Sequence, residues 1–137
     1  NIKLAEKMFY RGVLLEDVPN FGVVFGYTNA SWTLKAELVC EYMFRLINHM
    51  DSIKKSICMP VDLNNVKREL FLNLSSGYIK RAQDCIPKQG NVQPWRLDQN
   101  YNKDKKRLRD DNIEDGILQF KEPQISRKSQ ANDALQT

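Results

Sequence analysis

The clearest pattern in the chain is an apolar repeat, at steps of three and four, that starts at Trp32 and ends at about Met50. This period places the apolar side chains on one face of a helix, which would be about 28 Å long. Glu41 and Arg45 lie four positions apart, so we expect an ion pair between them on the helix surface. His49 comes late in the same helix, where a cation suits the helix dipole, and we favour this structural role over a catalytic one.

The segment before this helix predicts a strand followed by a turn. Val23–Phe25 is an apolar run between two glycines, which is typical of a short buried strand. Gly12–Leu15 is a second apolar run, so the two are expected to form a hairpin or neighbouring strands of one sheet. Thr28, Asn29 and Ser31 follow, and each has a side-chain oxygen that is able to cap the helix.

No Asp or Glu occurs between Phe21 and Ala36, so no side chain there would repel an anion at the start of the helix. Exposed N–H groups and the positive end of the helix dipole favour anionic ligands at such a position. Open α/β sheets also bind their ligands beyond the carboxyl ends of strands. The pattern therefore predicts either a ligand-facing strand-to-helix junction or an ordinary buried strand followed by a well-capped helix.

The remaining elements have weaker signals. Polar residues predict a loop over 51–61, and the pattern over 62–72 is ambiguous. A short helix is expected over 77–86, ended by Pro87, with a turn over 87–90. The other expected elements are a polar surface helix ending near Arg109, a short closing strand within 113–120 and a disordered tail over 121–137.

Composition limits the classes of partner. With 137 residues the chain has the length of one domain or of part of one, and 42% of its residues are hydrophobic. The net charge of +4 comes from 21 basic and 17 acidic residues that are largely intermixed. The basic run over 103–109 contains Asp104, so a solvated helix face is favoured over a phosphate-contacting patch, and no nucleic-acid partner is expected.

Other features bear on compartment and chemistry. No run of about 18 apolar residues occurs, so no transmembrane segment is expected. The three cysteines are widely spaced, which suits free thiols in a reducing compartment, and we expect the cytoplasm. With one histidine and scattered cysteines, no metal site is expected. The first residue is Asn rather than Met, as in a processed chain, a trimmed one or a piece of a longer one.

No motif assigns a catalytic residue. The sequences G-x-G-x-x-G, G-x-x-x-x-G-K-[ST], G-x-S-x-G and H-E-x-x-H are absent from the 137 residues. No Ser, Cys or Asp is singled out as a partner for His49 in a nucleophile–base pair. The sequence therefore gives no catalytic set.

Several segments carry a family signal, in one order along the chain: Val18–Asn20, Phe25–Leu38, Leu46–Asp51, Ser76–Ala82, Pro87–Gly90, Pro94–Tyr101 and Glu114–Gly116. Together they resemble the C-terminal region of FAD-containing monooxygenases, and more narrowly the class B enzymes of Baeyer–Villiger type. The resemblance runs from about Tyr10 to Phe120.

The resemblance implies an α/β fold in which residues 1–120 are the C-terminal part of a doubly wound FAD/NAD(P)-binding fold. It implies an enzyme that uses FAD, NADPH and O₂ to oxygenate a small-molecule substrate at a ketone or at a soft heteroatom such as S or N. The helix from Trp32 would direct its N-terminus at the flavin and stabilise negative charge on the reduced ring. The residues implied to bind the cofactor are Gly26, Tyr27, Thr28, Asn29, Ala30, Ser31 and Trp32.

Much of such an enzyme is missing from these 137 residues. Both glycine-rich dinucleotide motifs are absent, as are the segments expected to hold NADPH and the catalytic arginine. The chain alone is therefore expected to be inactive and to need the remainder of a monooxygenase chain as its partner. The alternatives are a truncated, catalytically inactive relic and a small non-enzymatic binding module.

Overall fold

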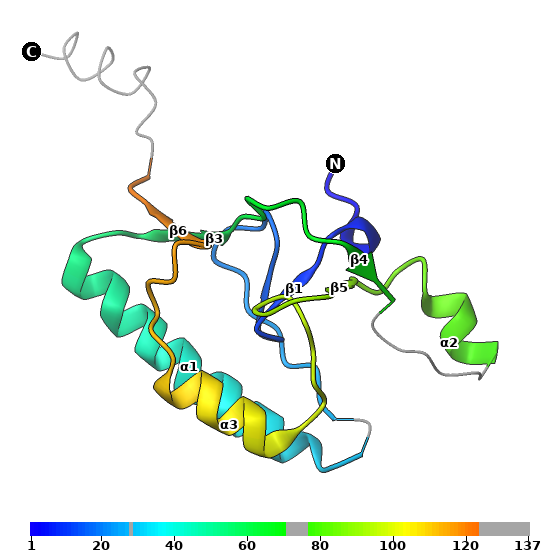
Figure 1. Cartoon of the computed structure of the whole chain (residues 1–137). Coiled ribbons are helices and arrows are strands. Elements are labelled where there is room, and N and C mark those ends of the chain that lie inside the picture. The colour runs from blue at the N-terminus through cyan, green and yellow to red at the C-terminus, as the bar shows by residue number, and fades with distance from the viewer. Residues whose placement is uncertain (28, 71–76, 124–137) are drawn as a thin grey trace, which may run out of the picture.

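A computed structural model describes residues 1–27, 29–70 and 77–123 (Figure 1). A long helix, α1, lies beside a shorter one, α3, and short strands lie to one side of both. The helices are α1 (Trp32–Ile53), α2 (Gly77–Ala82) and α3 (Tyr101–Asp110), together with a 3₁₀ helix at Leu4–Glu6. The strands are β1 (Phe9–Tyr10), β2 (Leu14–Leu15), β3 (Ile57–Pro60), β4 (Arg68–Glu69), β5 (Gln89–Gly90) and β6 (Leu118–Lys121).

The strands of the described residues form three two-stranded antiparallel sheets, β1 with β2, β3 with β6 and β4 with β5. The expected mixture of helix and strand is therefore confirmed. The parallel sheet that defines a doubly wound fold is not among these described sheets. Within the same residues, no helix has the length and apolar character that spanning a membrane requires.

The helix predicted from the apolar repeat is confirmed as α1, which continues past Met50 to Ile53. Ser31 caps its start, because the Ser31 hydroxyl oxygen accepts a hydrogen bond from the Thr33 N–H at 3.3 Å. Lys54 ends the helix in the left-handed conformation, with φ of 57°. The buried residues of α1 are Lys35, Leu38, Val39, Tyr42, Leu46 and Met50.

Residues 23–25 do not form the predicted buried strand. A single bridge joins Leu14 to Gly22, and beyond it the segment leaves β2 without forming a ladder. Aromatic contacts hold the segment instead, with the ring centroid of Phe25 lying 5.9 Å from that of Phe9. The apolar run is therefore only partly buried. It resembles a strand in sequence, but contacts between aromatic rings hold it in place instead of strand pairing.

The predicted loop over 51–61 is also wrong. The helix α1 extends into it, and β3 pairs with β6 so that Ile57 lies opposite Lys121 and Pro60 opposite Leu118. Proline usually argues against a paired strand because it lacks the N–H group. Here Pro60 is the last residue of β3, where the missing donor matters least.

The predictions for the second half are partly confirmed. The helix expected over 77–86 is α2, but it ends at Ala82, and β5 replaces part of the turn expected over 87–90. The polar surface helix is confirmed as α3. Asn100 caps it, since its side-chain oxygen accepts a hydrogen bond from the Lys103 N–H at 3.1 Å.

The closing strand predicted within 113–120 is confirmed as β6, which extends to Lys121. The predicted disordered tail over 121–137 is therefore wrong at its first residue, because Lys121 pairs with Ile57. The part of the tail over 124–137 lies outside the described residues.

The core lies where α1, the β1–β2 hairpin and α3 meet. Trp95, in the turn before α3, is 2% exposed and packs edge-on against Tyr10, with 5.7 Å between ring centroids. Leu108 of α3 and Leu118 of β6 belong to the same apolar cluster. Local elements too short to be stable alone are therefore held by one shared core.

The polar side of α1 packs against α3 and the residues after it. Arg109 donates two hydrogen bonds to Glu41, at 2.6 and 2.9 Å, and Arg45 donates to the carbonyls of Leu108 and Asp111. The ion pair predicted between Glu41 and Arg45 is therefore wrong. Both side chains reach across to the neighbouring segment instead of along their own helix.

Replacing Leu46 by alanine should lower the free energy of unfolding by about 2–5 kcal/mol, because its side chain is buried against the core. Leu46 is 1% exposed, whereas Leu63 is 66% exposed. The matched control Leu63→Ala should change the same free energy by less than about 0.5 kcal/mol. Urea unfolding measures both values, and equal losses would contradict the core assigned to α1.

Candidate functional site

The residues predicted to border a cofactor lie together where the chain enters α1. Their exposure increases along the segment, and Thr28 lies outside the described residues. The first turn of α1 carries no acidic side chain. The buried members are Gly26 and Tyr27, and the exposed members are Asn29, Ala30, Ser31 and Trp32.

Close packing with an indole ring explains the glycine at position 26. A Cβ atom on Gly26 would lie 2.1 Å from a ring carbon of Trp32, which is far inside any non-bonded contact distance. The Trp32 ring also lies 5.8 Å from the Phe25 ring, centroid to centroid, while 55% of Trp32 stays exposed. Glycine is therefore needed here for the chain's own aromatic contact.

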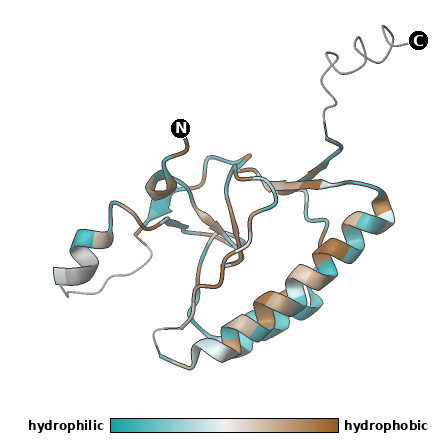
Figure 2. Ribbon diagram, turned by 180° about the vertical axis from the view of Figure 1, so that it is seen from behind, coloured by the Kyte–Doolittle hydropathy of each residue, from teal (hydrophilic) through white to brown (hydrophobic). Residues whose placement is uncertain are grey.

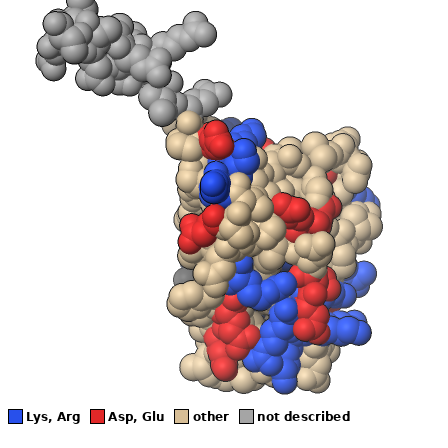
Figure 3. All heavy atoms as spheres, turned by 90° about the vertical axis from the view of Figure 1, so that its left-hand side faces the viewer, with Lys and Arg blue, Asp and Glu red and all other residues tan. Residues whose placement is uncertain are grey.

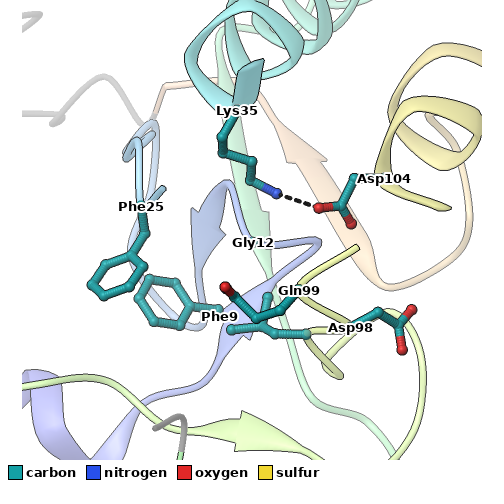
Figure 4. A pocket seen from close by; sticks show the side chains of 8 residues that line it. Phe9, Gly12, Phe25, Lys35, Asp98, Gln99 and Asp104 are labelled. Carbon is teal, nitrogen blue, oxygen red and sulfur yellow. Dashed lines mark hydrogen bonds and ion pairs between the residues drawn. The ribbon is translucent and has the colours of Figure 1, made fainter. Parts of the chain in front are cut away.

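A buried ion pair fixes the start of α1. Lys35 is only 4% exposed, which is rare for lysine, and its Nζ lies 3.2 Å from Asp104 Oδ2 on α3 (Figure 4). The Tyr27 hydroxyl donates to the same oxygen at 2.6 Å. Burial, and after it this hydrogen bond, raises the pKa of Tyr27 above its ordinary value. Asp104 therefore joins the junction, α1 and α3 at one carboxylate.

Sequence reasoning missed the residues that α3 and the turn before it bring to the junction. The Asn29 side-chain amide donates to the Gln99 carbonyl at 3.2 Å, and the Tyr101 ring meets the Tyr27 ring edge-on at 6.4 Å. One signal was present in the sequence, since Asp104 is an acidic residue inside a basic run. Its role as partner of a buried lysine follows only from the packing of α3 on α1.

A small hollow lies beneath the junction, with the rings of Phe9 and Phe25 side by side at its edge (Figure 4) and Leu97 among its lining residues. Gly12, at φ +66°, forms a further wall, and a Cβ there would lie 3.1 Å from Lys35 Nζ. The hollow measures about 10 Å³, which is enough for about one water molecule. A flavin ring does not fit inside it.

A second buried polar cluster surrounds Tyr10. Its hydroxyl donates to Asp115, and Arg11 contacts both residues, with 3.1 Å from Nε to the Tyr10 oxygen and 3.3 Å to Asp115. Asp115 also accepts hydrogen bonds from the amides of Ile117 and Leu118, each at 3.0 Å. This cluster ties the first hairpin to the segment that enters β6.

Burial and hydrogen bonds together set the ionisation of this cluster and of Tyr42, which interacts with Tyr10. Burial raises the pKa of Tyr42 to about 12 and, together with repulsion from Tyr42, raises the pKa of Tyr10 far above its ordinary value. Burial opposes the charge of Asp115, but hydrogen bonds from the Leu118 amide and the Tyr10 hydroxyl outweigh it and lower the pKa of this carboxyl. The cluster therefore keeps its tyrosines neutral and its carboxylate charged at neutral pH.

The basic run of α3 is confirmed as a solvated helix face. Lys103, Lys105 and Lys106 are exposed, while Arg107 pairs with Asp98 and Arg109 with Glu41. Figure 3 shows basic and acidic side chains interspersed on one face of the molecule. That distribution differs from the single-sign patch expected of a nucleic-acid interface.

The chain is similar over most of its length to curated proteins described as monooxygenases. It is 46% identical over 120 residues to the FAD-containing monooxygenase MymA of Mycobacterium tuberculosis, which covers 86% of this chain and 24% of that protein. It is 42% identical over 118 residues to the FAD-binding monooxygenase AlmA of an Acinetobacter species, covering 85% and 24% of the two. It is also 42% identical over 120 residues to the FAD-containing monooxygenase EthA of Mycolicibacterium smegmatis, covering 87% and 24%.

Identities at this level over most of the chain establish common ancestry. The chain is homologous to FAD-containing monooxygenases. It spans about a quarter of the length of the curated relatives that it matches. No protein-family model and no solved structure matches it.

The junction of this monooxygenase homologue combines an exposed helix start with no enclosed space for a cofactor. The start of α1 is exposed and free of acidic side chains. The hollow beneath it is too small for a cofactor, and the side chains of Tyr27, Asn29 and Ser31 already have partners within the chain. What the exposed residues of the junction offer a ligand is therefore mainly the positive end of the α1 dipole.

Removing the Asp104 carboxylate should destabilise the chain by about 3–5 kcal/mol, because it leaves Lys35 buried without a counter-ion. Asp110→Ala, at an exposed position of the same helix, is the matched control and should have little effect. The double variant Lys35→Met/Asp104→Asn should recover most of the loss, since no unpaired charge remains. Urea unfolding of Asp104→Ala, the double variant and the control tests this, and equal stability of all three would contradict the buried pair.

Stability should fall as the pH rises from about 10 to about 12, the ordinary and the folded-state pKa of Tyr42. In this interval the unfolded chain has lost a proton that the folded chain still binds, so unfolding becomes easier with rising pH. The raised pKa values of Tyr10 and Tyr27 act with the same sign. Tyr42→Phe should make the decline shallower in urea titrations across this range, and an unchanged slope would contradict the assignment.

Proposed function

We propose that this chain is part of a flavin-dependent monooxygenase that uses NADPH and O₂ to oxygenate ketones or soft heteroatoms such as sulfur and nitrogen. The observation that carries the proposal is 40–46% identity to FAD-containing monooxygenases over most of the chain. Bound flavin supplies the activation of O₂, and the protein supplies binding and orientation. Residues 1–120 would be the C-terminal part of a doubly wound FAD/NAD(P)-binding fold that upstream segments complete.

Within that enzyme, the segment Gly26–Trp32 would form one border of the FAD site. The positive end of the α1 dipole would face the flavin and stabilise negative charge on the reduced ring. Support comes from the exposure of Asn29, Ala30 and Ser31 and from the absence of acidic residues in the first turn. The Lys35–Asp104 pair would position this border by fixing the first turn of α1 against α3.

The chain by itself is proposed to be inactive. The glycine-rich motifs that hold the pyrophosphate of a dinucleotide are absent from it, and the hollow at the junction holds about one water molecule. Tight FAD binding and turnover therefore belong to the longer polypeptide. We assign no substrate contact to any of the described residues.

Purification of the longer polypeptide tests the proposal. We expect a yellow protein with flavin absorbance that oxidises NADPH faster when a ketone or a thioether is added. A longer polypeptide that is colourless, and that FAD does not reconstitute, would refute the proposal. A gene product limited to these 137 residues and inert toward NADPH would favour the inactive relic.

A charge placed at the junction tests its position in the same protein. Ala30→Asp adds a carboxylate next to the start of α1 and should raise the Kd for FAD about two- to fivefold, because the added charge offsets the positive end of the dipole and repels the FAD anion. Ala30→Asn has nearly the same shape without the charge and should leave the Kd close to that of the unchanged protein. Titration of the apoprotein with FAD measures both values, and equal effects of the two variants would place the flavin elsewhere.

A further inference from the structure

One side of α1 is apolar and uncovered in the described part of the chain. Ala36, Cys40, Met43, Phe44 and Ile47 are three or four positions apart, so they lie along one face, here named the apolar stripe. Phe44 is 68% exposed and Ile47 is 50% exposed. Figure 2 shows hydrophobic residues along the side of α1 that is turned away from α3.

A groove of about 370 Å³ continues this surface between α1 and the start of β3. Met43 and Ile47 belong to both the stripe and the groove, and Met43 also lies against Gly22, where a Cβ would come 3.1 Å from its sulfur. Leu14, Leu46 and Met50 also line the groove, together with Cys58 and the polar residues Asn20, Asp51, Lys55 and Ser56. Stripe and groove therefore form one continuous, largely apolar surface, with Asp51 and Lys55 as the charged residues of the groove.

The opposite side of α1 is already occupied. Glu41 pairs with Arg109, Arg45 donates to backbone carbonyls at the end of α3, and His49 Nε2 lies 3.0 Å from Glu114 Oε1. These charged and polar groups of α1 face α3 and the segment after it, whereas the stripe contains no charged side chain. A helix that is polar toward one neighbour and apolar on its free side needs a second neighbour.

We propose that the apolar stripe and the groove are the surface on which the upstream part of the same monooxygenase polypeptide docks. This inference rests on one element of the proposed function, namely that the chain belongs to a longer enzyme. The aligned region covers only 24% of each relative, so a partner large enough to cover α1 is available within one polypeptide. The partner surface should be apolar and poor in charge, as the centres of stable interfaces are.

The cysteines of the chain provide a direct test. Cys40 lies on the stripe and is exposed, Cys85 is exposed beyond α2, and Cys58 is buried. The longer polypeptide is treated with N-ethylmaleimide, and modification of each cysteine is followed by peptide mass spectrometry. In the native protein, we expect Cys40 to react at least about tenfold more slowly than Cys85. The two should react at similar rates in urea.

Each outcome bears on the proposal. Native Cys40 that reacts as fast as Cys85 would overturn it, because the stripe would then be open to solvent. Protection that disappears on dilution would also overturn it, since the occupant would be a second copy of the chain. Flavin absorbance of the same sample separates the proposed function from the proposed docking surface. A colourless protein with protected Cys40 refutes the proposed function alone. A yellow protein with reactive Cys40 refutes the docking surface alone.

A charged substitution on the stripe gives an independent readout. Phe44→Asp places a carboxylate at an exposed position of the chain, and Leu63→Asp does the same off the stripe, where the side chain is 66% exposed against 68% for Phe44. In the longer polypeptide, Phe44→Asp should lower the Tm by several degrees and Leu63→Asp should leave it nearly unchanged. Equal Tm values for the two variants would overturn the proposal.

Discussion

The buried contact between Lys35 and Asp104 is the interaction on which the arrangement of the junction depends. An ammonium group that is removed from water at the first turn of a helix, near the positive end of the dipole, is unfavourable unless a counter-charge accompanies it. Asp104 supplies that charge from α3, and Tyr27 donates a hydrogen bond to the same carboxylate. The position of α3 therefore determines where the segment before α1 runs.

The long helix α1 consequently has three different surroundings. Its buried face joins the apolar core that includes Tyr10 and Trp95, and its polar side is bonded to α3 and the segment that follows. Its third side is the apolar stripe, which is uncovered within the described residues. Its start is exposed at Ser31 and Trp32, and its first turn carries no acidic side chain. In the longer enzyme that we propose, a helix in this setting would join this chain to the rest of the polypeptide.

The sequence predicts what depends on local periodicity and capping. The repeat from Trp32 predicts α1, and a side-chain cap is predicted among three residues, of which Ser31 is the one observed. The apolar run at Val23–Phe25 misleads, because period alone does not separate a strand from an extended segment held by ring contacts. The strand β3 is missed for the related reason that its partner, β6, comes from the far end of the described chain.

The candidate site shows the same difference between what local sequence predicts and what tertiary packing adds. The segment Gly26–Trp32 is proposed from local signals and family resemblance together, whereas Asp104, Gln99 and Tyr101 reach it only through tertiary packing. Gly26 illustrates how a glycine near a proposed ligand site has more than one explanation. Here the Trp32 indole occupies the space above it, so the residue type follows from packing within the chain.

A crystal structure of the longer polypeptide with FAD bound would show where the cofactor lies relative to α1. We expect the flavin ring at the N-terminus of α1, with backbone N–H groups of the segment from Asn29 to Trp32 in contact with it. A bound FAD whose ring system lies away from Asn29 and Ser31, with the start of α1 open to solvent, would contradict this expectation.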